Sequence, residues 1–266
     1  MRFRLLALLL LTGLLAPCPA PANDAGSVDL ELVLAVDVSL SMDDEEQHLQ
    51  RQGYVDAFRD PVIIEAIRGG AQGRIAVAYL EWAGYGETRL LMDWTLIDGA
   101  ESAKAFADTL EAKPYSRIRR TSISGGLQAA VRLFGQRYRG LRRTIDVSGD
   151  GANNEGPLVA PVRDQIVAQG VTINGLPLML KRSPWSPFDM ADLDLYYEDC
   201  VIGGPSAFVI PVREIEQFHK AVRDKLILEI AGLEPPPRLI PAAARERPPC
   251  DVGERQWERW MRGGYQ

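Results

Sequence analysis

The sequence has few of the residues and motifs on which most hydrolytic and nucleotide-binding sites depend. It contains two histidines, His48 and His219, and both fall in segments with helical periodicity. It contains no Gly-x-Ser-x-Gly nucleophile motif and no Gly-x-x-x-x-Gly-Lys-Ser/Thr phosphate loop. These absences argue against a serine hydrolase and against a P-loop nucleotide site.

A surplus of basic residues is also missing. The chain has 30 Lys and Arg residues against 36 Asp and Glu residues, a formal net charge of −6. Nucleic-acid-binding domains normally carry the opposite balance. We interpret the local basic stretches Arg117–Arg120 and Arg137–Arg143 as solvated faces. No nucleic-acid partner is expected.

No hydrophobic run reaches the length of a transmembrane helix. Arg2 and Arg4 precede the apolar run Leu5–Leu15, and Ala20-Pro21-Ala22 supplies a small-x-small cleavage pattern. Together they predict a signal peptide over residues 1–22 and a periplasmic or secreted mature protein. The alternatives are a membrane anchor, which needs about twenty apolar residues, and lipidation at Cys18, for which the preceding proline is a poor fit.

Cleavage after residue 22 would leave two cysteines, Cys200 and Cys250. In an oxidising compartment such a pair favours a single disulfide. Two unpaired thiols are the alternative.

The segment 23–231 alternates strand-like and helix-like patterns. Leu30–Val36 is a nearly continuous apolar run, typical of a strand buried on both faces. This alternation predicts one doubly wound α/β domain with a mostly parallel sheet and helices on both faces. The expected strands are 30–36, 74–82, 88–94, 144–147, 171–178 and 207–212, and the expected helices are 43–59, 100–111, 124–138, 157–169, 189–199 and 213–230.

The composition changes after residue 231. The stretch 232–249 contains six prolines, which forbid a regular helix and predict an extended linker. Within the last segment, 250–266, Trp257, Trp260 and Met261 recur at helical spacing. They predict a short amphipathic helix docked on the domain, with a membrane or partner contact as the alternative.

Three polar features follow predicted strands or begin a predicted helix. Asp37, Ser39 and Ser41 follow the first strand, Thr121 precedes a Gly-containing helix start, and Asp150 follows the strand 144–147. In open parallel sheets, ligands bind beyond the carboxyl ends of the strands. Two carboxylates and three hydroxyls are the hard oxygen ligands that Mg²⁺ prefers. The pattern predicts a divalent-cation site, with Mg²⁺ expected and Mn²⁺ or Ca²⁺ as alternatives.

The same residues resemble the metal-ion-dependent adhesion site of von Willebrand factor type A domains. The stretches VSLSM, YLEWAG, IDVSGDGANNEG and YYEDCVIGGPSAFV further resemble a bacterial group of exported type A-like proteins without an assigned activity. The resemblance covers about residues 28–231. It implies that Ser39, Ser41 and Thr121 coordinate the cation, that Asp37 and Asp150 act directly or through water, and that an acidic residue of a protein partner completes the site.

Each of these features, taken alone, also has a purely structural interpretation. Ser41 could cap the following helix, Asp150-Gly151 could be an ordinary turn, and the acids 43–46 suit a helix N-terminus. Asn153, Asn154 and Glu155 could shape ligand access, although turn chemistry explains them as well.

Two other functions compete with a non-catalytic binding module. One is a metal-dependent phosphohydrolase with Asp37 as nucleophile, similar to haloacid-dehalogenase-like phosphatases. That family places a second aspartate where this chain has Ser39, and a hydroxyl cannot perform its proton transfer. The other is a small-molecule receptor, for which two lobes are usual and the length leaves little room.

Overall fold

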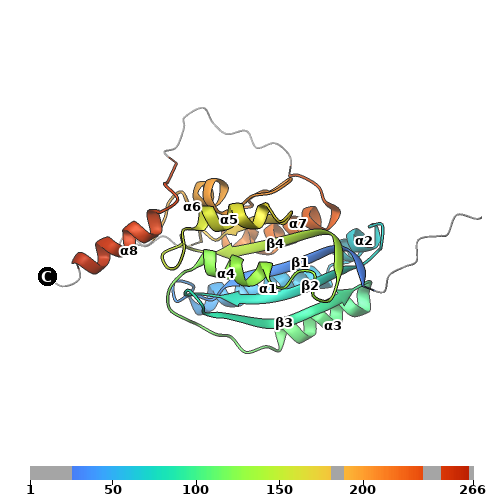
Figure 1. Cartoon of the computed structure of the whole chain (residues 1–266). Coiled ribbons are helices and arrows are strands. Elements are labelled where there is room, and N and C mark those ends of the chain that lie inside the picture. Colours follow the sequence, from blue (N-terminus) through green and yellow to red (C-terminus); the bar gives the residue numbers. More distant parts are fainter. Residues whose placement is uncertain (1–25, 181–188, 236–246, 264–266) are drawn as a thin grey trace, which may run out of the picture.

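The computed structural model describes residues 26–180, 189–235 and 247–263. Its centre is a five-stranded sheet in the order β3-β2-β1-β4-β5 (Figure 1). The strands β2, β1, β4 and β5 are parallel to one another. The edge strand β3 pairs antiparallel with β2. The strands are β1 (Ser27–Asp37), β2 (Ile75–Trp82), β3 (Thr88–Ile97), β4 (Arg139–Gly149) and β5 (Thr172–Pro177).

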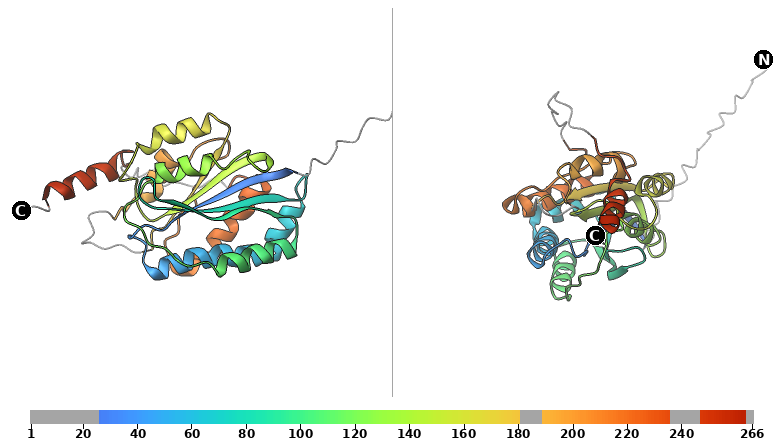
Figure 2. Two further views of the ribbon diagram at one scale, coloured as in Figure 1. Left: turned by 60° about the horizontal axis from the view of Figure 1, so that its bottom comes forward. Right: turned by 90° about the vertical axis from the view of Figure 1, so that its left-hand side faces the viewer.

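Helices cover both faces of the sheet (Figure 2). α1 (Asp44–Arg59), α2 (Pro61–Arg68), α3 (Ala100–Glu111) and α7 (Phe218–Ala231) contribute to one apolar core. α4 (Ile123–Val131), α5 (Val159–Val167), α6 (Leu193–Tyr196) and the π-helical turn η1 (Tyr197–Val201) contribute to the other. The doubly wound, mostly parallel α/β domain predicted from the sequence is confirmed.

The central strand shows why the sequence adopts this fold. β1 alternates its side chains between the two cores, with Leu32 and Leu34 in one and Val33 and Ala35 in the other. All four are fully buried. A strand covered by helices on both faces needs apolar residues at every position, which explains the continuous run seen in the sequence.

Three sequence predictions of elements need correction. Residues 207–212 make only isolated bridges, Gly175 with Val209 and Leu178 with Val212, because Pro211 interrupts any longer ladder. The helix predicted over 124–138 ends at Val131, before Gly135 adopts a φ of 71°. The unpredicted helix α2 begins with the Asp60 side chain accepting from Val62 N, and Pro61 occupies its first turn.

A cluster of buried charges lies in the core that includes α7. The Lys225 ammonium is 2.6 Å from Asp146 Oδ1 and also pairs with Glu229. All three side chains are at most 1% exposed. Asn174 Nδ2 donates to Glu229 Oε1 at 2.8 Å, and Tyr54 donates to Asp146. The domain itself therefore supplies a positive charge between these two acids.

The C-terminal segment is tied to the domain by a covalent bond. Cys200 and Cys250 form a disulfide, as the sequence predicted. α8 (Val252–Gly263) follows it and extends outward from the domain (Figures 1 and 2). Only Gly253 of this helix is buried, so the expected docking involves its first turn and the contact of Trp257 with Arg120.

Several predictions of the chain's organisation concern residues beyond this description. The signal peptide predicted over residues 1–22 lies outside the described residues, as does most of the predicted linker 232–249. Within the described ranges, no helix combines the length and apolar character needed to cross a membrane.

Candidate metal centre

The candidate residues gather at one edge of the sheet because two parallel strands end there together. β1 pairs with β4 in a register that places Val36 beside Ser148. The next residue of β1, Asp37, therefore meets the end of β4, just before Asp150. β2 and β4 lie on opposite sides of β1. The carboxyl ends of β1 and β4 therefore form a topological switch point, where ligands of open α/β sheets bind.

Four of the five predicted residues form a continuous chain of hydrogen bonds. Ser39 N donates to Asp37 Oδ1 at 2.7 Å, and the Ser39 and Ser41 hydroxyls are 2.8 Å apart. Ser41 Oγ donates to Asp150 Oδ1 at 2.7 Å. The interpretation of Ser41 as a helix cap is wrong: Asp43 caps α1, in a reciprocal capping box with Glu46.

Thr121, the fifth residue, lines the same pocket as Ser39, Ser41 and Asp150. Asn154 forms hydrogen bonds with both the backbone amide and the backbone carbonyl of Thr121. Thr121 N donates to Asn154 Oδ1 at 3.1 Å, and Asn154 N donates to Thr121 O at 2.8 Å. The structure thus brings all five predicted residues together, and it gives Asn154 a positioning role that turn chemistry alone did not predict.

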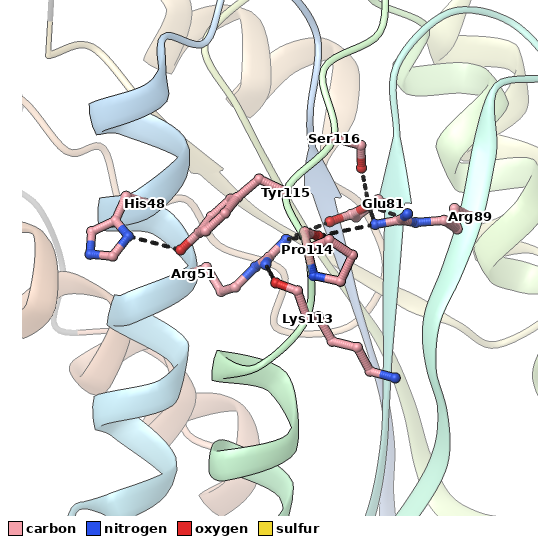
Figure 3. A network of polar contacts seen from close by, with 8 residues as sticks. All are labelled: His48, Arg51, Glu81, Arg89, Lys113, Pro114, Tyr115 and Ser116. Carbon is pink, nitrogen blue, oxygen red and sulfur yellow. Dashed lines mark hydrogen bonds and ion pairs between the residues drawn. The ribbon is translucent and has the colours of Figure 1, made fainter.

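A second polar network fastens the loop that leads to Thr121 (Figure 3). The buried Arg51 of α1 pairs with Glu81 of β2 at 2.8 Å and donates to Lys113 O at 2.5 Å. Ser116 donates to Glu81 Oε2 at 2.7 Å. Farther along the loop, Ile118 N donates to Val38 O, inside the Asp-x-Ser-x-Ser segment. The network connects helix, strand and loop and so fixes the position of the Thr121 loop.

Two acids without a basic partner, the buried Asp37 and the partly buried Asp150, dominate the electrostatics of the site. Burial, and then the charge of Asp150, raise the pKa of Asp37 well above its ordinary value. Burial raises the pKa of Asp150 to about 7, and the charges of Glu46 and Asp189 add to this effect. Among the described residues, no basic side chain forms an ion pair with Asp37 or Asp150, and Asp37 Oδ2 is buried without a hydrogen-bond partner.

The donor set fits a hard divalent cation. It consists of carboxylate and hydroxyl oxygens only, the ligands that such cations prefer. A cation at this edge would supply the positive charge that the two acids lack. Ser39, Ser41 and Thr121 could hold it, with Asp37 and Asp150 binding directly or through water.

Gly149 makes the close approach of β4 to Asp37 possible. A Cβ at this position would lie 2.7 Å from Asp37 Oδ2 and 3.1 Å from the Tyr197 hydroxyl. The 2.7 Å contact is shorter than ordinary Cβ contacts and the buried Asp37 has little room to move, so glycine is favoured at this position. The same packing keeps the Asp37 carboxylate fully buried.

The pocket above these residues has a volume of about 550 Å³ and includes residues from the C-terminal helix. Trp257 and Trp260 of α8 line it, as do Arg119 and Arg120. The sequence placed these arginines on a solvated face. Arg119 and Arg120 line a pocket only because α8 lies opposite them, and no local sequence pattern predicts where α8 lies.

Comparisons with known proteins agree with this architecture. Residues 27–234 match the family model described as "Protein of unknown function (DUF1194)". No curated protein matches the chain.

Solved structures share the fold at low sequence identity. The pilus adhesin SpaC from Lactobacillus rhamnosus GG, in an open conformation, aligns with a TM-score of 0.55 at 12% identity, over 76% of this chain and 30% of that one. Proximal thread matrix protein 1 from the mussel byssus, with a zinc-occupied MIDAS motif, aligns with a TM-score of 0.54 at 15% identity, over 76% of this chain and 46% of that one.

A von Willebrand factor type A protein from Catenulispora acidiphila aligns with a TM-score of 0.49 at 15% identity, over 77% of this chain and 43% of that one. This chain spans less than half the length of each of these three structures. The resemblance stated from the motifs is confirmed at the level of fold by the SpaC adhesin and by the mussel protein with its MIDAS motif, both of which share this α/β architecture.

Proposed function

The chain belongs to the family described as proteins of unknown function (DUF1194), and we propose that it is an exported, divalent-cation-dependent protein-binding module. The observation that carries the proposal is a pair of acids, the buried Asp37 and the partly buried Asp150, with no basic partner among the described side chains. Burying charge without compensation is unfavourable. A cation taken from solution would remove that penalty, and Mg²⁺ is the expected ion.

The partner side of the proposal follows from cation chemistry. Mg²⁺ prefers about six oxygen ligands and rarely takes all of them from one protein cage. Ser41, Thr121 and Asp150 line an open pocket, so a ligand from outside can approach the same point. An acidic side chain of a partner protein would supply a charged oxygen there. The SpaC adhesin and the zinc-occupied MIDAS motif of the mussel protein support such a function by fold similarity.

The geometry gives no support to Asp37 as a phosphoryl-accepting nucleophile. Its carboxylate is fully buried, and Oδ1 accepts from Ser39 N. Gly149 packs against Oδ2. A nucleophile needs an open line of approach to its substrate. We therefore propose a non-catalytic role. Turnover of an aryl phosphate with Mg²⁺, lost in Asp37→Asn, would overturn that part of the proposal.

Cation-dependent capture tests the binding function. The chain is immobilised with its disulfide intact, loaded with an extracytoplasmic protein fraction in Mg²⁺ and eluted with a chelator. We expect specific partners in the chelator eluate, and none from Thr121→Ala. Asn substitution of exposed acids on a captured partner should then identify one essential carboxylate. Equal capture by wild type and Thr121→Ala in chelator would contradict the proposal.

A further inference from the structure

The C-terminal helix adds an aromatic wall to the pocket that holds the candidate metal residues. Trp257 and Trp260 of α8 line it together with Ser41, Thr121 and Asp150. The two indole rings lie 4.8 Å apart between centroids. Trp260 is 47% exposed. The pocket therefore combines a polar floor, built from the sheet edge, with an aromatic side, built from the tail.

The first turn of α8 fixes this wall beside the loop that carries Asp150. The disulfide from Cys200 to Cys250 ends two residues before the helix. Gly253 packs so tightly that a Cβ there would lie 2.1 Å from Asn153 O. Asn153 Nδ2 also donates to Glu254 Oε1 at 2.7 Å. These contacts place the tail at the metal pocket rather than elsewhere on the domain.

The remaining sides of the pocket carry two arginines, the apolar Leu40, and the polar or acidic residues Asn154, Gln256 and Asp189. The Arg120 guanidinium lies 3.3 Å from the centroid of the Trp257 ring, and Arg119 is exposed on the pocket lining. Leu40, between the two candidate serines, also lines the pocket and is 45% exposed. In a chain with a net charge of −6, two arginines at this opening favour an acidic partner.

We propose that the pocket recognises a protein segment in which an acidic residue is next to a large apolar side chain. The carboxylate lies on the polar floor, and the apolar side chain packs against Trp257, Trp260 and Leu40. Aromatic residues of this kind commonly supply most of the affinity of an interface. The inference rests on the proposed function and deepens it by naming the second residue that the partner must carry.

Capped dipeptides test the two halves of the pocket separately. Acetylated, amidated Asp-Phe, Asp-Ala and Asn-Phe are titrated by NMR into the disulfide-bonded chain, in Mg²⁺ and in chelator, with Phe-Asp as the reversed order. We expect a peptide with adjacent Asp and Phe to bind about tenfold more tightly than Asp-Ala, a difference of about 1.4 kcal/mol. Asn-Phe should not bind, and chelator should abolish binding of all the acidic peptides.

Variants assign the apolar preference to α8. Trp257→Ala and Trp260→Ala should reduce binding of the Phe peptide to that of Asp-Ala. Met261→Ala is the matched control, because Met261 is on the same helix and 43% exposed but does not line the pocket. It should leave the preference intact. Trp260 is half exposed, so its variant keeps the test available if Trp257→Ala does not fold.

The outcomes separate this inference from the proposed function. Equal, Mg²⁺-dependent binding of Asp-Phe, Phe-Asp and Asp-Ala would overturn the inference and leave the proposed function standing. Binding of Asn-Phe in chelator would overturn it in favour of an apolar site unrelated to the metal. Absence of Mg²⁺-dependent binding by every acidic peptide would overturn both.

Discussion

Asp146 and Glu229 lie in the core on either side of the Lys225 ammonium, whereas Asp37 and Asp150 lie at the carboxyl edge of the same sheet without a basic partner among the described side chains. Asp146, Glu229 and Asp37 are buried, and Asp150 is partly buried, within the same domain. The first pair is also supported by Asn174 and Tyr54. The second pair is supported by the Ser41 hydroxyl, which donates to Asp150, and by the Ser39 backbone amide, which donates to Asp37.

The difference shows how structural and functional burial of charge can be distinguished. Where a chain needs buried acids only for its own fold, it can supply the balancing cation from a neighbouring helix, as α7 does with Lys225. At the sheet edge the balancing charge is missing, and the pocket above is open. This contrast is the physical reason to expect a cation from solution at one place and not at the other.

Removing the internal cation should have the largest effect. Lys225→Met leaves Asp146 and Glu229 buried without a positive charge, which costs about 3–5 kcal/mol of the free energy of unfolding. Urea denaturation measures it. Lys220→Met is the matched control on the same helix: Lys220 is 73% exposed and pairs with Asp224, so the change should be within about 0.5 kcal/mol. Equal stability of the two variants would show that the core cluster does not need its lysine.

Opening the disulfide should reduce the binding contribution of Trp257 and Trp260 more than that of the candidate metal residues. Cys250→Ser releases a link with a sequence separation of 50, worth up to about 4 kcal/mol of unfolding free energy by the chain-entropy model. Because α8 is held at its first turn, the preference for the Phe peptide should decrease as well. Thermal unfolding and peptide titration measure the two effects. If only the unfolding temperature changes, the bridge is purely structural.

The pH dependence of stability should report the core pair. Burial raises the pKa of Glu229 to about 7, above its value in the unfolded chain. Between these two values the folded chain holds a proton that the unfolded chain releases, so stability falls as the pH rises toward 7. In urea denaturation at pH 5, 6, 7 and 8, Glu229→Gln should remove the contribution of Glu229 and make the slope shallower, while the raised pKa values of Asp37 and Asp150 maintain the rest. The exposed Glu216→Gln should retain the wild-type slope, and a slope in Glu229→Gln equal to that of the wild type would contradict the assignment.

The sequence predicts those parts of the fold and site that depend on local patterns. The apolar run of β1, and the polar residues placed directly after β1 and β4, locate Asp37, Ser39, Ser41 and Asp150 without any knowledge of distant contacts. Local patterns do not predict the hydrogen bonds of Asn154 to Thr121 or the ion pair of Lys225 with Asp146, because both join segments that are distant in the sequence. The position of α8 depends on a disulfide and on one close glycine contact, so the helix could be predicted but its place at the pocket could not.

Direct measurement of cation binding tests the central claim. Mn²⁺ is titrated into the chelator-treated chain, bound and free ion are distinguished by electron paramagnetic resonance, and Mg²⁺ is added as competitor. We predict one Mn²⁺ site that Mg²⁺ displaces, lost in Asp150→Asn and retained in Asp44→Asn, whose carboxylate is 88% exposed beside the site. Absence of bound Mn²⁺ at millimolar concentration, or equal binding by wild type and Asp150→Asn, would contradict the account.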